Sequence, residues 1–136
     1  RPSFEVNISP RERLADLSDI LILPTPVPNS VHSYWNFVVL FRDNFVDEVA
    51  ERMTSFMRAR QIDARRLFFP MHEMPPYSSL RRIGECPNSV AASQRGVAFP
   101  ASPKLTDAQI HDVCSTFRRG IEMLDVERLT PREAQA

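Results

Sequence analysis

The sequence predicts an α+β domain with a small antiparallel or mixed sheet of about three strands and helices packed on it. Two observations lead to this fold class. Runs rich in β-branched and aromatic residues alternate along the chain with segments whose apolar residues repeat at helical spacing. The connections are too short to join every pair of strands as a parallel crossover, so part of the sheet should be antiparallel.

Length and composition fit a single folded domain. The 136 residues can bury a core without disulfides, and 43% hydrophobic with 25% charged residues is typical of globular chains. The 17 basic and 17 acidic residues cancel, so neither nucleic acid nor an anionic membrane is expected as a partner. The apolar runs are too short to cross a bilayer and no signal peptide pattern is present, which favours a cytoplasmic location.

Residues 1–31 are predicted to form a connecting arm. Residues 9–12 have the order of a capping box, which indicates a helix of about two turns that ends near Ser18. The apolar residues 20–23 and the prolines within 24–28 then predict a short extended piece followed by polyproline-like chain. Such an arm packs on a surface or leads in from a neighbouring domain.

The α+β domain itself is predicted to span residues 32–127. Residues 31–41 are largely apolar on both faces, which is typical of a central strand. Asp43 or Asn44 is placed to cap the next helix, whose apolar residues repeat at helical spacing as far as Met57. We expect this helix to lie on the sheet.

The middle of the chain predicts two further strands. Residues 64–69 form the second strand, and 70–87 form a long loop rich in proline. A short helix is expected to begin at an Asn88 cap and to end at Gly96. Residues 97–100 then form the third strand.

The last helix carries the clearest local signals. Thr106 and Gln109 have the spacing of a capping box, and Leu105 and Ile110 occupy the two positions of a hydrophobic staple. The apolar face of this helix comprises Ile110, Val113, Cys114, Phe117, Ile121 and Leu124. Residues 128–136 are predicted to be a polar tail.

Several side chains could in principle ligate a metal, namely His32, His72, His111, Cys86 and Cys114. None of them has a CxxC, HxxxH or HExxH spacing, so we expect no metal site. Cys114 is expected to be a small core residue on its helix, which makes a catalytic thiolate improbable at that position. The three glycines are too scattered to form a phosphate-binding loop.

The stretch RLFFPMHEMPPY, residues 66–77, ends an apolar strand in a loop stiffened by prolines. His72, Glu73 and Tyr77 lie on this loop at the carboxyl end of the strand. Prolines reduce the entropy that a loop loses on ordering, and binding residues are often carried on such loops. The residues alone leave two interpretations open: a binding edge, or a rigid surface loop whose polar side chains are solvated.

Three segments together, HSYWNFVVLF, RRLFFPMHEMPPY and CPNSVAASQRGVAFPASPKLTDAQIHDV, resemble the carboxyl-terminal portion of the DegT/StrS sugar aminotransferases. These are pyridoxal 5'-phosphate (PLP) enzymes with the aspartate aminotransferase fold, fold type I. The resemblance covers roughly residues 10–125. It implies an α+β small domain packed on a large PLP-binding domain, and transfer of an amino group from glutamate or glutamine to a keto-sugar, often nucleotide-linked. It also implies a homodimer.

The resemblance implies that His72 contacts the substrate, with Glu73 and Tyr77 as further candidates. The catalytic and cofactor-binding residues of the family lie in the large domain, upstream of the matched region. PLP chemistry needs a lysine amine, and Lys104, the only lysine, lies in what is expected to be an exposed turn. We therefore expect the chain alone to bind no PLP and to be inactive. Asn88 and Ser89 depart from the family pattern after the Cys-Pro pair.

Two hypotheses follow from the resemblance. The chain is the small domain of an aminotransferase and forms one wall of a substrate cleft, or it is a non-catalytic binding or dimerisation module derived from the same fold. The apolar residues 20–23 would suit a missing domain or a partner.

Overall fold

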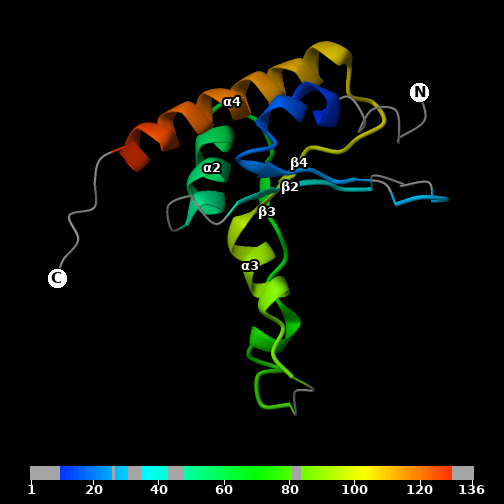
Figure 1. The fold of residues 1–136 in the computed structure, drawn as a ribbon, viewed down its shortest axis with the longest axis vertical. Helices are drawn as coiled ribbons and strands as arrows, with labels where there is room; N and C mark the ends of the chain where they lie inside the picture. The colour runs from blue at the N-terminus through cyan, green and yellow to red at the C-terminus, as the bar shows by residue number, and fades with distance from the viewer. Residues whose placement is uncertain (1–9, 26, 31–34, 43–47, 81–83, 130–136) are drawn as a thin grey trace.

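The computed structural model describes residues 10–25, 27–30, 35–42, 48–80 and 84–129, the last five by their backbone alone (Figure 1). A four-stranded antiparallel sheet carries helices on its faces, which confirms the predicted α+β class. The elements are η1 (Ala15–Leu17), β1 (Leu21–Ile22), β2 (Phe37–Phe41), α2 (Val49–Arg58), β3 (Arg65–Arg66), η2 (Met71–Glu73), α3 (Pro87–Arg95), β4 (Gly96–Phe99) and α4 (Asp107–Leu129).

The strands are arranged in the order β1-β2-β4-β3, and β2 lies inside the sheet as predicted. Phe37 pairs with Phe99 and Leu21 pairs with Phe41. The apolar run predicted as a short extended piece forms β1, so the sheet has one strand more than expected. Strand β2 begins at Phe37, and Trp35, predicted within the strand, is 75% exposed. Residues 31–34 of the predicted strand lie outside the described residues.

The core lies between the sheet and the pair α2 and α4, which cover the same face (Figure 1). Alternate residues of β2, Phe37, Val39 and Phe41, are buried on this face. Phe117 of α4 packs edge-on against Phe99 with ring centroids 4.9 Å apart, and lies 5.7 Å from the ring of Phe41. Aromatic rings in such tilted contacts stabilise a core beyond their buried area.

The segment from residue 10 to 23 is fixed to this core. Leu14 and Leu21 are buried, and residues 10–13 form a helical turn as predicted, although its expected cap Ser9 lies outside the described residues. Arg118 of α4 holds the segment by donating hydrogen bonds to both carboxylate oxygens of Asp16 and to the carbonyl of Arg13. The hydrogen bond from Arg118 lowers the pKa of Asp16 below its usual 3.8.

Helix α4 begins as the sequence predicts. The Thr106 amide donates to Oε1 of Gln109 at 2.9 Å, and the Gln109 amide donates to Oγ1 of Thr106 at 3.2 Å, which completes the capping box. Ile110 is buried and Leu105 packs on the core. Helix α2 has Glu48 at its N-cap with φ 62°, and the predicted caps at residues 43 and 44 lie outside the described residues.

The N-cap of helix α3 lies two residues earlier than predicted. Pro87 occupies its first turn and Cys86 its N-cap position, so the prediction that Asn88 caps the helix is wrong. The fixed φ of proline suits the first helical position, and this preference prevails over the capping ability of the asparagine. The helix ends at Gly96 as expected. The glycine has extended backbone, φ −89° and ψ 130°, and is itself the first residue of β4.

Two glycines, Gly96 and Gly120, lie where neighbouring atoms leave little room for a side chain. A Cβ on Gly96 would lie 2.6 Å from the carbonyl oxygen of Ala92 and 2.9 Å from Cβ of Leu67. A Cβ on Gly120 would lie 2.6 Å from Sδ of Met53. The nearest atom at Gly96 belongs to the backbone, whereas the nearest atom at Gly120 belongs to the flexible end of a side chain.

Gly96→Ala should therefore destabilise the chain by about 2 to 3 kcal/mol, because the backbone of α3 or the start of the loop must shift. Gly120→Ala should cost less than about 1 kcal/mol, since Met53 can turn aside and alanine favours the helix by about 1 kcal/mol over glycine. Urea unfolding of the two variants measures the difference. Equal losses of stability would contradict this account of the Gly96 contact.

The pair of Asp16 and Arg118 predicts a pH dependence. An aspartate whose pKa is lowered on folding stabilises the fold above its unfolded pKa, and this contribution disappears as the pH falls through its folded pKa. Asp16→Asn should lower the urea concentration at the midpoint of unfolding at neutral pH. The difference in this midpoint between the variant and the parent chain should disappear as the pH falls below 3.8. In an Arg118→Met background the same substitution should have no effect. An equal effect in both backgrounds would show that Arg118 is not the partner that matters.

Candidate functional site

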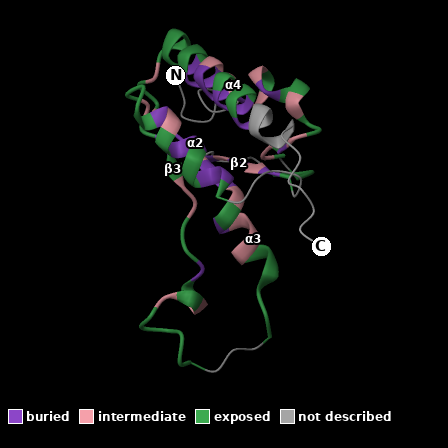
Figure 2. Ribbon diagram, turned by 90° about the vertical axis from the view of Figure 1, so that its left-hand side faces the viewer, coloured by how far each residue is buried: buried purple, intermediate pink, exposed green. Residues whose placement is uncertain are grey.

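The connection between β3 and α3 extends away from the body of the domain (Figures 1 and 2). Its described residues, 67–80 and 84–86, are here called the projecting loop. Most of them are exposed, as the colouring of Figure 2 shows. The loop lies on the side of the sheet away from α4 (Figure 1).

Local turns order the backbone of this loop. The amides of Glu73 and Met74 donate to the carbonyls of Pro70 and Met71 at 3.0 and 3.1 Å, and so form the single turn η2. The Tyr77 amide donates to the carbonyl of Met74 at 2.9 Å. Consecutive turns with proline between them give the loop a defined shape although it has no core of its own.

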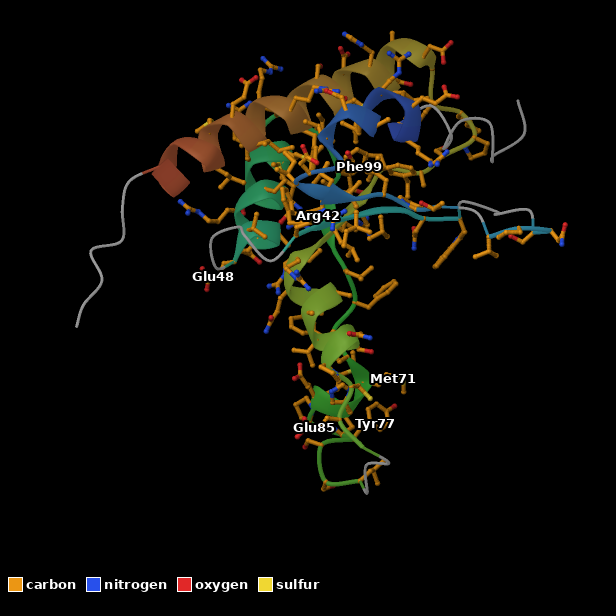
Figure 3. All side chains as sticks on the ribbon, viewed as in Figure 1. Arg42, Glu48, Met71, Tyr77, Glu85 and Phe99 are labelled. Atoms are coloured by element: carbon orange, nitrogen blue, oxygen red, sulfur yellow. The ribbon has the colours of Figure 1, made fainter. Side chains whose placement is uncertain are left out.

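The residues predicted to contact a substrate share this loop. His72 lies on η2 and is half-buried, and the neighbouring Glu73 is exposed. Tyr77 follows one turn later with 42% of its surface exposed. Figure 3 shows Met71, Tyr77 and Glu85 in the lower part of the loop, away from the sheet. The loop therefore carries an imidazole, a carboxylate and a phenol on an ordered segment far from the core.

The strand predicted over residues 64–69 is shorter than expected. Strand β3 comprises Arg65 and Arg66 alone, although the Leu67 amide still donates to the carbonyl of Gly96 at 3.1 Å. Beyond Leu67 the neighbouring chain is helix α3, which offers no strand for pairing. The extended segment of residues 68–69 therefore leaves the sheet.

As a result, large apolar side chains lie on the surface of the loop. The exposed fractions are 72% for Phe68, 61% for Phe69, 64% for Met71 and 60% for Leu80. Sequence reasoning assigned the two phenylalanines to the apolar strand predicted over residues 64–69 and so missed this surface. Concentrated exposed apolar side chains mark surfaces that contact another protein or domain.

Two hollows elsewhere on the described chain are lined by other residues. One of about 590 Å³ lies between the end of α2 and α4, beside Arg60, Asp112 and Arg119. The other, of about 380 Å³, lies beside β1 and Arg42. Neither is lined by His72, Glu73 or Tyr77, so these two hollows do not enclose the predicted site residues.

The cysteines and histidines of the described residues form no metal-binding cluster. Within the described ranges no three His, Cys, Asp or Glu side chains are placed to hold a metal ion, and His32 lies outside those ranges. Cys114 is buried in the core as predicted, and burial raises the pKa of its thiol to about 11. A thiol with so high a pKa is a poor nucleophile. Cys86 is exposed.

The residues of this chain do not by themselves fit PLP. The cofactor is held in its enzymes by a lysine amine. Lys104, the only lysine, is exposed in the turn before α4. The connection that contains this turn lies on the α4 side of the sheet, whereas the projecting loop lies on the other (Figure 1). The single lysine of this sequence is therefore not beside the projecting loop.

The described structure is thus an α+β domain that presents polar groups on a projecting loop and supplies no amine near them. Comparison with known families identifies its class. The profile of the DegT/DnrJ/EryC1/StrS aminotransferase family matches residues 9–118, and the chain belongs to this family.

The chain is similar in sequence to sugar-modifying enzymes. It is 29% identical to a GDP-perosamine synthase of Vibrio cholerae over 64% of this chain and 23% of that protein. It is 28% identical to a dTDP-4-dehydro-2,3,6-trideoxy-D-glucose 4-aminotransferase of Saccharopolyspora spinosa over 80% of this chain and 26% of that protein. The chain thus spans about a quarter of the length of these relatives.

Solved structures share the fold. The aminotransferase TlmJ from Streptoalloteichus hindustanus superposes with a TM-score of 0.76 at 22% identity, over 92% of this chain and 32% of that one. DesV from S. venezuelae superposes with a TM-score of 0.74 at 22% identity, over 87% and 30%. None of the helices in the described part of the chain is both long and apolar enough to cross a membrane.

The two cysteines should differ in reactivity towards a thiol reagent. Cys86 is exposed and should be labelled at once in the native chain. Cys114 should react more than about a hundredfold more slowly, because labelling requires the core to open. Mass spectrometry after timed quenching distinguishes the two sites, and labelling in denaturant gives the control in which both react. Rapid native labelling of Cys114 would contradict its placement in the core.

Proposed function

We propose that this chain is the small domain of a PLP-dependent aminotransferase that acts on a nucleotide-linked keto-sugar. Family membership supports the reaction type, and the names of the relatives support the substrate class. The observation that carries the proposal is the projecting loop, which holds His72, Glu73 and Tyr77 away from the domain's own core. In this proposal the loop forms one wall of the substrate cleft.

The other wall would belong to a large domain that binds the cofactor. This chain covers 32% or less of the solved relatives named above, and its single lysine lies in the turn before α4 and not on the projecting loop. PLP bound in the large domain would supply the carrier of the amino group. The residues of this chain would bind and orient the sugar and exclude water from it.

Each of the three side chains has a role that follows from its chemistry. The imidazole of His72 can both donate and accept hydrogen bonds, which suits sugar hydroxyls or a phosphate. The carboxylate of Glu73 accepts hydrogen bonds from hydroxyl groups, and the ring of Tyr77 offers a flat apolar surface with a polar tip. Because local turns already order the loop, little entropy is lost when the substrate binds.

The exposed apolar side chains of the loop are an argument for a neighbouring domain or subunit. Phe68, Phe69 and Met71 are each more than 60% exposed, which is costly unless another surface covers them. We assign this surface to the large domain, and we propose that the complete enzyme is a homodimer. The amino donor would be glutamate or glutamine.

His72→Ala in the complete enzyme should lower kcat/KM for the keto-sugar by about tenfold or more, because one hydrogen bond to a polar substrate is lost. The absorbance of lysine-bound cofactor should be unchanged. His111→Ala is the matched control, since this histidine lies on α4 and accepts a hydrogen bond from Arg13. The isolated 136-residue chain should show no such absorbance with added PLP. Unchanged turnover in His72→Ala would remove this residue from the site.

A further inference from the structure

The position of the projecting loop depends on how its two ends leave the domain. The loop is ordered internally by its own turns, and those turns do not fix its direction relative to the sheet. At its far end the chain enters α3, which contacts α2 and β2. At its near end the chain leaves β3, a strand of two residues that contacts β4 and α2.

One side chain reinforces the near end. Nη1 of Arg66 donates to Oε2 of Glu51 on α2 at 3.0 Å. The guanidinium carbon of the same arginine lies 5.4 Å from the centre of the Phe69 ring, three residues into the loop. A guanidinium over an aromatic ring is attracted to its face. Arg66 therefore connects helix α2 with the first residues of the projecting loop.

The environment of Arg66 makes this arginine depend on Glu51. Its Nε is buried and has no hydrogen-bond partner among the described residues, and its side chain is 34% exposed. Because the Nε of Arg66 has no partner in the described part of the chain, the position of its guanidinium depends on the two groups that do contact it there, the carboxylate of Glu51 and the ring of Phe69. Without the carboxylate of Glu51, the guanidinium would turn towards water and leave the ring of Phe69.

The next ion pair along the chain provides a comparison. Arg65 donates to both carboxylate oxygens of Asp63 at 3.2 and 2.8 Å. Both side chains are well exposed, at 71% and 66%, and the pair connects two positions before the loop. Asp63 and Arg65 thus have the same chemistry and nearly the same place in the sequence, but no contact with the loop is made by this pair in the described structure.

We propose that Glu51 and Arg66 are positioning residues that set the direction of the projecting loop and thereby the place of His72. This inference rests on the proposed function of the loop. Glu51 contacts no substrate in this scheme, and it acts by holding Arg66 against Phe69. The effect is modest in energy because the ion pair is half-exposed.

Hydrogen exchange on the 136-residue chain tests the structural half of the proposal. Glu51→Ala should speed exchange of the Leu67 amide, which donates to the carbonyl of Gly96 where the loop leaves the sheet, by about two- to fivefold. The amides of Glu73, Met74 and Tyr77, which lie in the loop's internal turns, and the amides of β2 should be unaffected. Asp63→Asn should leave the Leu67 amide unchanged. Equal acceleration at Leu67 and in β2 would mean general destabilisation and would overturn the proposal, as would unchanged exchange at Leu67.

The charge-reversed double variant, Glu51→Arg with Arg66→Glu, separates the ion pair from either side chain alone. It restores a pair of opposite charges across the same gap but removes the guanidinium from the ring of Phe69, so it should recover only part of the slow exchange that each single reversal loses. Failure of this rescue, with each single reversal as harmful as the double, would show that the attraction between the two groups does not hold the loop.

Kinetics of the complete enzyme test the functional half. Glu51→Ala should raise KM for the keto-sugar by about two- to fivefold with kcat unchanged, because the folded enzyme is intact and its substrate contact is displaced. A fall in kcat at unchanged KM would report loss of folded enzyme and would overturn the positioning role, and so would kinetics equal to the parent's. If the parent enzyme aminates no keto-sugar, the proposed function fails, while the exchange measurement still decides whether the pair holds the loop.

Discussion

The meeting of a helix and a strand at Gly96 determines much of this structure. Helix α3 ends and β4 begins at this residue with no connecting turn. The helix carbonyl of Ala92 and the side chain of Leu67 approach so closely that a Cβ has no room. Because β4 starts at Gly96, the chain that follows β3 has no strand to pair with beyond Leu67. The chain therefore leaves the sheet at that point.

The domain therefore has two parts that are stabilised in different ways, one by a buried core and the other by local turns. On one side of the sheet, α2 and α4 bury a continuous core around Phe117. On the other, the projecting loop keeps its shape through local turns and exposes its apolar side chains. Turn hydrogen bonds within residues 70–80 give this part of the loop a defined shape without a core of its own. In the proposed function, such a loop would offer its polar groups to a substrate without a large entropic cost.

Sequence reasoning succeeded where the determining interactions are local. The capping box of Thr106 and Gln109 and the apolar stripe of α4 depend on residues a few positions apart, and the structure confirms them. It failed for Phe68 and Phe69 because their burial depends on the length of β4, a strand far along the chain. Likewise β1 was predicted only as an extended piece, since its partner Phe41 is not a neighbour in sequence. His72, Glu73 and Tyr77 stay a prediction because their place on an exposed loop does not show what they contact.

Many of the basic residues form hydrogen bonds with the backbone of the domain. Almost all are arginines, and several donate to backbone carbonyls at the ends of helices and turns. These are Arg42 to Ser18, Arg58 to Ala64, Arg60 to Phe56, Arg95 to Ala91 and Arg118 to Arg13. The guanidinium group presents several donors in a planar arrangement, which suits this task better than an ammonium does. These five guanidinium groups therefore bind backbone carbonyls of the domain itself. In the proposed function, the lysine that binds PLP would come from another domain, and this domain would provide one wall of the substrate cleft.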